Sequence, residues 1–169
     1  MFKKVREGMS REENVIKYYV FCNKLKDMIR TGWKEWNVKR ERVESVAEHI
    51  FGTQMLAVAM WSEYRYDIDI QKVLTMLALH EMEEIIICDL TQFDVDKQTK
   101  LINGHKAVEK LVSILIKGAD LKSIIYEFDE KQTPEAKFAF YCDKLECDLQ
   151  SKLYDEQHCV DLAKQKIKN

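Results

Sequence analysis

Three ionisable side chains lie in apolar stretches of this chain, where they are expected to face a protein core. His49 follows Glu48, His80 precedes Glu81, and Asp143 lies far downstream in another apolar helical pattern. Burying an imidazole or a carboxylate without a partner is costly, so these groups need a common partner. A divalent cation that contacts all three would provide it, and the sequence therefore predicts a metal site.

The helix expected around His80 brings further carboxylates close to this site. Residues at positions i and i+4 lie on one face of a helix, and position i+1 is turned from i by about 100°. His80, Glu81 and Glu84 therefore share one side of the helix, whereas Glu83 is expected to point into water. The other two groups must come from the preceding helix and from the C-terminal helix, so three helices would converge on one ion.

Two imidazoles and two carboxylates form a mixed nitrogen and oxygen ligand set. Such a set suits a six-coordinate divalent ion with open water positions (Mn, Co, Fe, Ni or Mg) better than a closed tetrahedral zinc. Zinc stays open as an alternative, because affinity alone usually favours it over manganese. We therefore expect a divalent metal ion as the cofactor.

The elements that must position these groups are helices. Glycine and proline are scarce, at five and one in the chain, and apolar residues recur at spacings of three and four. The expected helices are residues 11–29, ending near Thr31 and Gly32; 43–61; 73–85, with Asp69 as N-cap; 108–116, ended by Gly118; and 134–154, with Thr133 as N-cap and Pro134 in the first position. The sequence predicts an all-α fold, a compact bundle of five to seven helices, with residues 1–169 forming one domain.

The composition excludes several classes of function. The formal net charge of -2 comes without the basic stripe that general nucleic-acid binding needs. The longest apolar run, residues 55–61, is too short to cross a bilayer, and residues 1–14 contain no apolar signal core. The five cysteines form no CxxC pair, which is typical of reduced thiols in the cytosol. We expect a cytoplasmic protein that binds neither nucleic acid nor membranes.

Four groups of residues, taken in order, resemble the motifs of the HD-domain phosphohydrolases. They are Arg30-Thr31-Gly32-Trp33; Glu44-Ser45-Val46-Ala47-Glu48-His49; His80-Glu81-Met82-Glu83-Glu84 with Asp89-Leu90-Thr91; and Thr133-Pro134-Glu135-Ala136-Lys137-Phe138 leading to Asp143-Lys144-Leu145-Glu146. The resemblance spans residues 25–149 and is strongest to the small 5′-deoxynucleotidase branch. It implies an all-α HD-domain bundle, usually found as a homodimer.

The resemblance also implies a metal-binding set, in which the ligands are His49, His80, Glu81 and Asp143. Three departures from the family pattern accompany it. Glu81 stands where the family has the aspartate of its His-Asp pair, one methylene longer but still a hard oxygen donor. Cys88 stands where the family usually has glycine, and the stretch between Trp33 and His49 is about two residues longer than is typical.

The resemblance implies a second set of residues, which would act on or bind the substrate. Glu84 would be the catalytic carboxylate, and Asp89 would support the attacking water or the substrate. Arg30 and Trp33 would contact the phosphate and the nucleotide near the entrance of the site. Structural roles compete with these: Arg30 could interact with the C-terminal dipole of a helix, Trp33 could be a core or dimer aromatic, and Asp89 could be a turn or cap residue.

The sequence therefore predicts a metal-dependent phosphomonoesterase. It would hydrolyse a small phosphorylated substrate, a nucleoside (deoxy)ribonucleotide 5′-monophosphate, to a nucleoside and phosphate. Two alternatives stay open. The same site could act on a nucleoside triphosphate or another small phosphoester, or the bundle could be a noncatalytic nucleotide-binding module whose ion only stabilises the fold.

Overall fold

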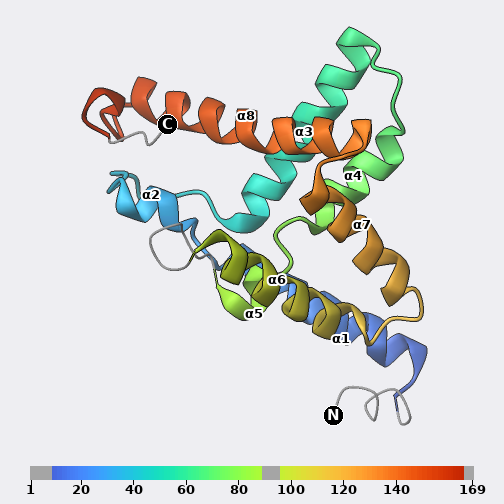
Figure 1. Cartoon of the computed structure of the whole chain (residues 1–169). Coiled ribbons are helices and arrows are strands. Elements are labelled where there is room, and N and C mark those ends of the chain that lie inside the picture. Colours follow the sequence, from blue (N-terminus) through green and yellow to red (C-terminus); the bar gives the residue numbers. More distant parts are fainter. Residues whose placement is uncertain (1–8, 89–95, 166–169) are drawn as a thin grey trace.

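The computed structural model describes residues 9–88 and 96–165 (Figure 1). Its elements are α1 (Arg11–Asn23), η2 (Lys24–Lys26), α2 (Thr31–Glu35), α3 (Val46–Tyr64), α4 (Ile70–Leu79), α5 (Glu84–Ile87), α6 (Lys97–Val112), α7 (Gly118–Glu130), α8 (Pro134–Glu156) and η3 (Leu162–Lys164). The described residues form no strand, and one isolated bridge joins Ile29 to Ser45. The prediction of an all-α fold is confirmed.

Local capping explains where several helices begin. Ser45 precedes α3 and forms a capping box with Glu48, whose backbone N–H donates to the serine hydroxyl over 3.2 Å. The predicted N-caps are confirmed: Asp69 accepts hydrogen bonds from two backbone N–H groups of α4, and Thr133 accepts one from α8. Pro134 occupies the first position of α8, where its missing N–H is not needed.

Helices α3, α4 and α8 pack against one another, and α7 covers α4 and α8 (Figure 1). Their shared core consists of Ala57, Val73, Met76, Leu77, Phe128, Ala136, Ala139 and Cys142. A second apolar cluster joins the end of α4 to α6 and α7, and α1 lies against α6. Burial of these apolar side chains is the main source of stability. No helix in the described segments has both the length and the apolar character needed to cross a membrane.

The first predicted helix is shorter than expected. Helix α1 ends at Asn23, and the residues expected to end it, Thr31 and Gly32, begin α2 instead. Between these helices the backbone is held by residues far along the chain, since the Arg30 N–H donates to the Glu44 carbonyl over 3.1 Å. This long-range pairing overrides the helical pattern that was predicted to continue to residue 29.

The predicted helix through His80 is also interrupted. Helix α4 ends at Leu79, and residues 80–83 form a turn before the short helix α5. Inside the turn the Met82 N–H donates to the Leu79 carbonyl, and the Glu84 N–H to the Glu81 carbonyl, each three residues back. The prediction that one continuous helix presents these side chains on a single face was therefore wrong.

Gly118 begins a helix, where the sequence predicted that it would end one. Helix α6 ends at Val112, and α7 starts at Gly118. A Cβ atom at position 118 would lie 2.1 Å from the Val112 carbonyl oxygen. Only glycine permits this close approach, which turns the chain sharply between the two helices.

Candidate metal centre

Four ligand atoms from three parts of the chain lie within 4.8 Å of one another. They belong to His49 on α3, to His80 and Glu81 in the turn after α4, and to Asp143 on α8. His49 Nε2 lies 3.1 Å from Asp143 Oδ1, 3.4 Å from His80 Nε2 and 3.7 Å from Glu81 Oε1. Adjacent ligands of an octahedral ion bound at about 2.1 Å lie roughly 3 Å apart, so this cluster is close to the size of a metal shell.

Hydrogen bonds on the far side of each imidazole point Nε2 into the cluster. His80 Nδ1 donates to the Leu77 carbonyl over 2.8 Å, within the last turn of α4. His49 Nδ1 donates to Glu146 Oε2 on α8 over 2.5 Å. Metal-binding histidines are commonly oriented by such contacts, because these fix the tautomer that leaves the other nitrogen free for the metal.

The charges of the cluster fit a divalent cation. Although burial raises the pKa of Asp143, the hydrogen bond with His49 and the nearby His80 hold it well below its usual range. Burial also works against ionisation of Glu81, but the charges of His80, Arg30 and His49 lower its pKa. Burial alone would lower the pKa of His49, yet hydrogen bonds with Asp143 and Glu146 raise it to about 9. A proton on His49 thus offsets part of the negative charge of the two carboxylates, and a divalent ion would displace it.

Glu84, the predicted catalytic carboxylate, is the first residue of α5 and only 2% exposed. Asp89 lies outside the described residues. Between them, Cys88 has φ 63° and ψ 168°, a backbone conformation that side chains with a Cβ rarely adopt. This is the position at which the sequence departs from the glycine of the HD-domain pattern.

Arg30 borders the metal cluster. Its Nη1 lies 3.9 Å from Glu81 Oε1, its Nε lies 3.9 Å from Glu44 Oε2, and its Nη2 donates to Cys147 Sγ over 3.2 Å. Arg30 is the N-cap residue of α2, so it does not lie at a helix C-terminus. A favourable interaction with a C-terminal dipole therefore cannot explain this arginine.

Trp33 is buried beside Arg30. Its indole Nε1 donates to Glu44 Oε2 over 2.7 Å, and its ring packs edge-to-face on Trp36 and Tyr154. A cavity of about 440 Å³ opens next to these residues, and its lining includes Arg30, Trp33 and Trp36. The tryptophan is therefore part of an aromatic cluster and also part of a cavity wall.

The carboxylate that orients His49 is not among the site residues predicted from the sequence. Glu146 lies three residues after Asp143 on α8, and residues at this spacing are neighbours on a helix surface. The spacing was a usable signal for a group near the metal. Its contact with His49 was not predictable, because 97 positions separate the two residues.

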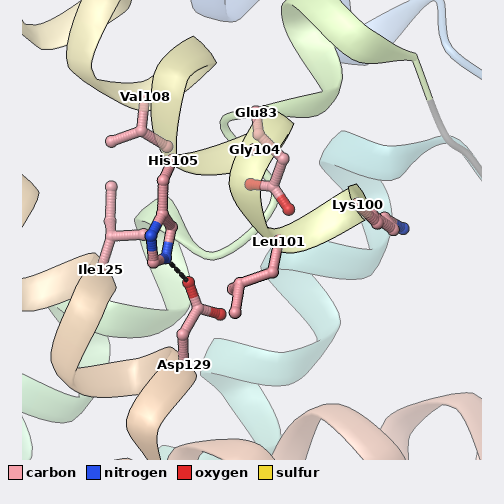
Figure 2. A pocket seen from close by; sticks show the side chains of 8 residues that line it. All are labelled: Glu83, Lys100, Leu101, Gly104, His105, Val108, Ile125 and Asp129. Atoms are coloured by element: carbon pink, nitrogen blue, oxygen red, sulfur yellow. Dashed lines mark hydrogen bonds and ion pairs between the residues drawn. The ribbon is translucent and has the colours of Figure 1, made fainter. Parts of the chain in front are cut away.

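The expectation that Glu83 points into water was wrong. Its partly buried side chain enters a cavity of about 190 Å³ between α5, α6 and α7, beside His105 and Asp129 (Figure 2). Burial, with the nearby charge of Glu81, raises the pKa of Glu83 to about 8. His105 Nε2 lies 2.8 Å from Asp129 Oδ2. Among the described residues, no three atoms that could bind a metal ion come together in this cavity, in contrast to the cluster at His49.

Comparisons with known proteins agree with the geometry. The HD domain family model matches residues 22–168. The 5′-deoxynucleotidase HDDC2 of Danio rerio is 31% identical over 151 residues, which cover 85% of this chain and 71% of that protein. The PH0347 protein of Pyrococcus horikoshii OT3 superposes with a TM-score of 0.74 at 26% identity, over 88% of this chain and 83% of that one. A protein of Magnetospirillum magnetotacticum MS-1, described as a predicted metal-dependent phosphohydrolase, has a TM-score of 0.67 at 25% identity, over 81% and 68% of the two chains.

Proposed function

Because this chain belongs to the HD-domain family, we propose that it is a metal-dependent phosphomonoesterase acting on nucleoside 5′-monophosphates, with deoxyribonucleotides as the preferred class. The observation that carries the proposal is the convergence of two histidines and two carboxylates at one point, with Arg30 at its border. The 5′-deoxynucleotidase name of the Danio rerio relative supports the substrate class.

His49, His80, Glu81 and Asp143 would hold the ion, since these four offer their ligand atoms together. When bound, a divalent cation supplies Lewis acidity that polarises a phosphoryl oxygen and makes water more acidic. The mixed nitrogen and oxygen donors favour Mn, Co, Fe, Ni or Mg over a closed zinc site. Metal analysis of gently purified protein identifies the ion.

Arg30 would bind the phosphate. A guanidinium matches the geometry of phosphate oxygens and stabilises the charge that develops on them during hydrolysis. Arg30 contacts the metal cluster through Glu81 and also lines the 440 Å³ cavity, so it lies between the two. This volume is within the range of small-molecule pockets, and the nucleoside would enter the cavity beside Trp33 and Trp36.

Glu84 would act as the general base. In the proposed reaction it accepts a proton from water as the water oxygen attacks phosphorus. The bond between phosphorus and the 5′ oxygen breaks, and that oxygen takes a proton from solvent water and leaves as the nucleoside hydroxyl, after which Glu84 returns its proton to solvent. Asp89 would support the water or the substrate. Glu84 is buried and directly follows the turn that carries His80 and Glu81, which supports this role.

We also propose that two copies of the chain form a homodimer. Helices α3 and α8 pack together and expose large apolar side chains at helical spacing: Phe51, Met55 and Val58 on α3, and Tyr141, Leu145, Leu149 and Leu153 on α8. Exposed apolar surface of this kind marks interaction sites. Light scattering should show a dimer that Leu149→Glu converts to a monomer; a monomeric unmodified protein would reject the proposal.

A phosphate-release screen tests the function. The protein, supplied in turn with each divalent ion, should release orthophosphate from deoxyribonucleoside 5′-monophosphates faster than from ribonucleotides. Pyrophosphate or triphosphate released from nucleoside triphosphates would instead identify a triphosphate hydrolase. If no phosphoester is cut although the ion binds, the bundle is a noncatalytic module.

A further inference from the structure

Two buried carboxyl groups lie behind the metal ligand His49, on the side away from the cluster. Glu146 and Glu44 are each only 8% exposed. Glu146 Oε2 lies 2.5 Å from His49 Nδ1, and Glu146 and Glu44 line the same cavity. Neither carboxyl group belongs to the four metal ligands, so their burial needs a separate reason.

The backbone of α3 makes room for Glu146. A Cβ atom at Gly52 would lie 2.7 Å from Glu146 Oε1 and 3.1 Å from its Cγ. Gly52 comes three residues after His49, on the part of α3 that faces α8. The absence of a side chain at this position thus lets the carboxylate of α8 reach the imidazole of α3.

Glu44 extends this contact toward the proposed phosphate site. Its Oε2 accepts a hydrogen bond from Trp33 Nε1 over 2.7 Å and lies 3.9 Å from Arg30 Nε. Its backbone N–H donates to the Tyr154 hydroxyl over 2.9 Å, which fixes the segment that carries it. Burial and the charge of Glu146 raise the pKa of Glu44 to about 7, which shows that the two carboxyl groups lie close enough to interact.

We propose that Glu146 and Glu44 are positioning residues that link the metal site to the anion site. Glu146 holds His49 with Nε2 toward the ion, and Glu44 joins Glu146 to Arg30 and Trp33. The metal part of this proposal needs only the geometry at His49, whereas the part that concerns Arg30 rests on the proposed function. Partners of this kind typically alter metal affinity by about 10- to 100-fold.

Calorimetric titration of metal-stripped full-length protein with Mn²⁺ tests the first part. Glu146→Gln keeps the size of the side chain but removes the charge that accepts the His49 proton, so its dissociation constant should rise at least about 10-fold. Glu156→Gln, an exposed change on the same helix, should bind Mn²⁺ like the unmodified protein. Equal affinity in the two variants would overturn the role of Glu146.

Magnetic resonance of the Zn²⁺-loaded protein gives a readout that does not depend on activity. The His49 Nδ1–H proton should give a slowly exchanging signal, because Glu146 accepts it in a buried site. In Glu146→Gln the signal should exchange faster, while circular dichroism confirms the fold. An unchanged exchange rate would count against the proposal even if the metal affinity fell.

The second part is tested with inorganic phosphate as the probe. Glu44→Leu should weaken phosphate binding to the Mn²⁺-loaded protein severalfold when Arg30 is present, and should have no further effect in an Arg30→Ala background. Additive losses would show that Glu44 does not act through Arg30. None of these measurements needs turnover. If the unmodified protein lacks nucleotidase activity but Glu146→Gln still weakens metal binding, the proposed function is rejected and the positioning role of Glu146 stands.

Discussion

Arg30 Nη1 lies 3.9 Å from Glu81 Oε1, so the guanidinium forms an ion pair with a carboxylate of the candidate metal cluster. The two residues come from different parts of the fold, the N-cap of α2 and the turn after α4. A phosphate that contacts both the ion and a guanidinium would have its charge offset from two sides. We therefore propose that the phosphate group binds at the border between the cluster and the 440 Å³ cavity.

Replacing Arg30 by alanine should lower kcat/KM for a deoxyribonucleoside monophosphate by about 100-fold, the usual effect of losing one donor to a developing charge. Arg30→Lys should recover only part of the loss, because an ammonium cannot form the bidentate contact. Lys34→Ala, an exposed change on α2, serves as the control. Steady-state phosphate release gives the values, and an Arg30→Ala variant with unchanged kcat/KM would remove Arg30 from the site.

Substitutions of Glu84 and of His80 should reduce activity for different reasons. Glu84→Gln should keep the metal but reduce kcat by about 100-fold or more, because it loses the proposed general base. His80→Ala should lose the ion itself, because its Nε2 is one of the four ligand atoms. Metal content and turnover measured on the same samples separate the two effects. Normal turnover in Glu84→Gln would reject the catalytic role.

Glu81→Asp tests whether the site is built around glutamate. Glu81 Oε1 lies 3.7 Å from the Nε2 atom of both His49 and His80, and aspartate would withdraw the carboxylate by about one C–C bond, roughly 1.5 Å. We expect the Mn²⁺ dissociation constant to rise about 10-fold and turnover to fall with it. A gain in both would instead show that glutamate impairs a site suited to aspartate.

The sequence predicted the helices best where their boundaries are set locally. Asp69 and Thr133 cap helices through hydrogen bonds to residues two or three positions away, so the sequence next to them contains the signal. The interruption at His80 was not predictable in this way. The apolar pattern continues to residue 85, but the side chain of His80 bonds to the Leu77 carbonyl and faces a cluster built from α3 and α8.

The candidate site shows the same difference between features set by neighbouring residues and features set by contacts far along the chain. The apolar stretches around His49, His80 and Asp143 predicted three of the residues that the structure brings together, and the family resemblance added Glu81. Glu146 was not assigned to the site, and Glu83 was expected to point into water, because the surroundings of both residues depend on glycines in other helices. Gly52 on α3 admits Glu146, and Gly104 on α6 would place a Cβ atom only 3.3 Å from Glu83 Cγ. The space that a glycine leaves in another helix cannot be predicted from the residues next to either glutamate.

Replacing Cys88 by glycine should stabilise the protein by about 1 kcal/mol, because glycine adopts a positive φ with little strain. Cys88 has φ 63° immediately after α5. Cys88→Ala is the matched control, since it removes the thiol but keeps the Cβ atom and hence the strain. Urea unfolding compares the three proteins, and equal gains in both variants would assign the effect to the thiol.

Glu44 should make stability fall as the pH rises toward neutrality. Its pKa is about 7 in the folded protein, against an ordinary value of 4.5. Folding therefore takes up a proton between these values, and the resulting stabilisation is complete below about pH 4.5 and lost as the pH rises through 7. The shift corresponds to about 3 kcal/mol. Urea unfolding at pH 5 and pH 8, with a chelator present, should show this extra fall in the unmodified protein and in the exposed control Glu63→Gln. Glu44→Gln imitates the protonated form and should lack it, and parallel pH profiles for all three proteins would show that Glu44 titrates normally in the fold.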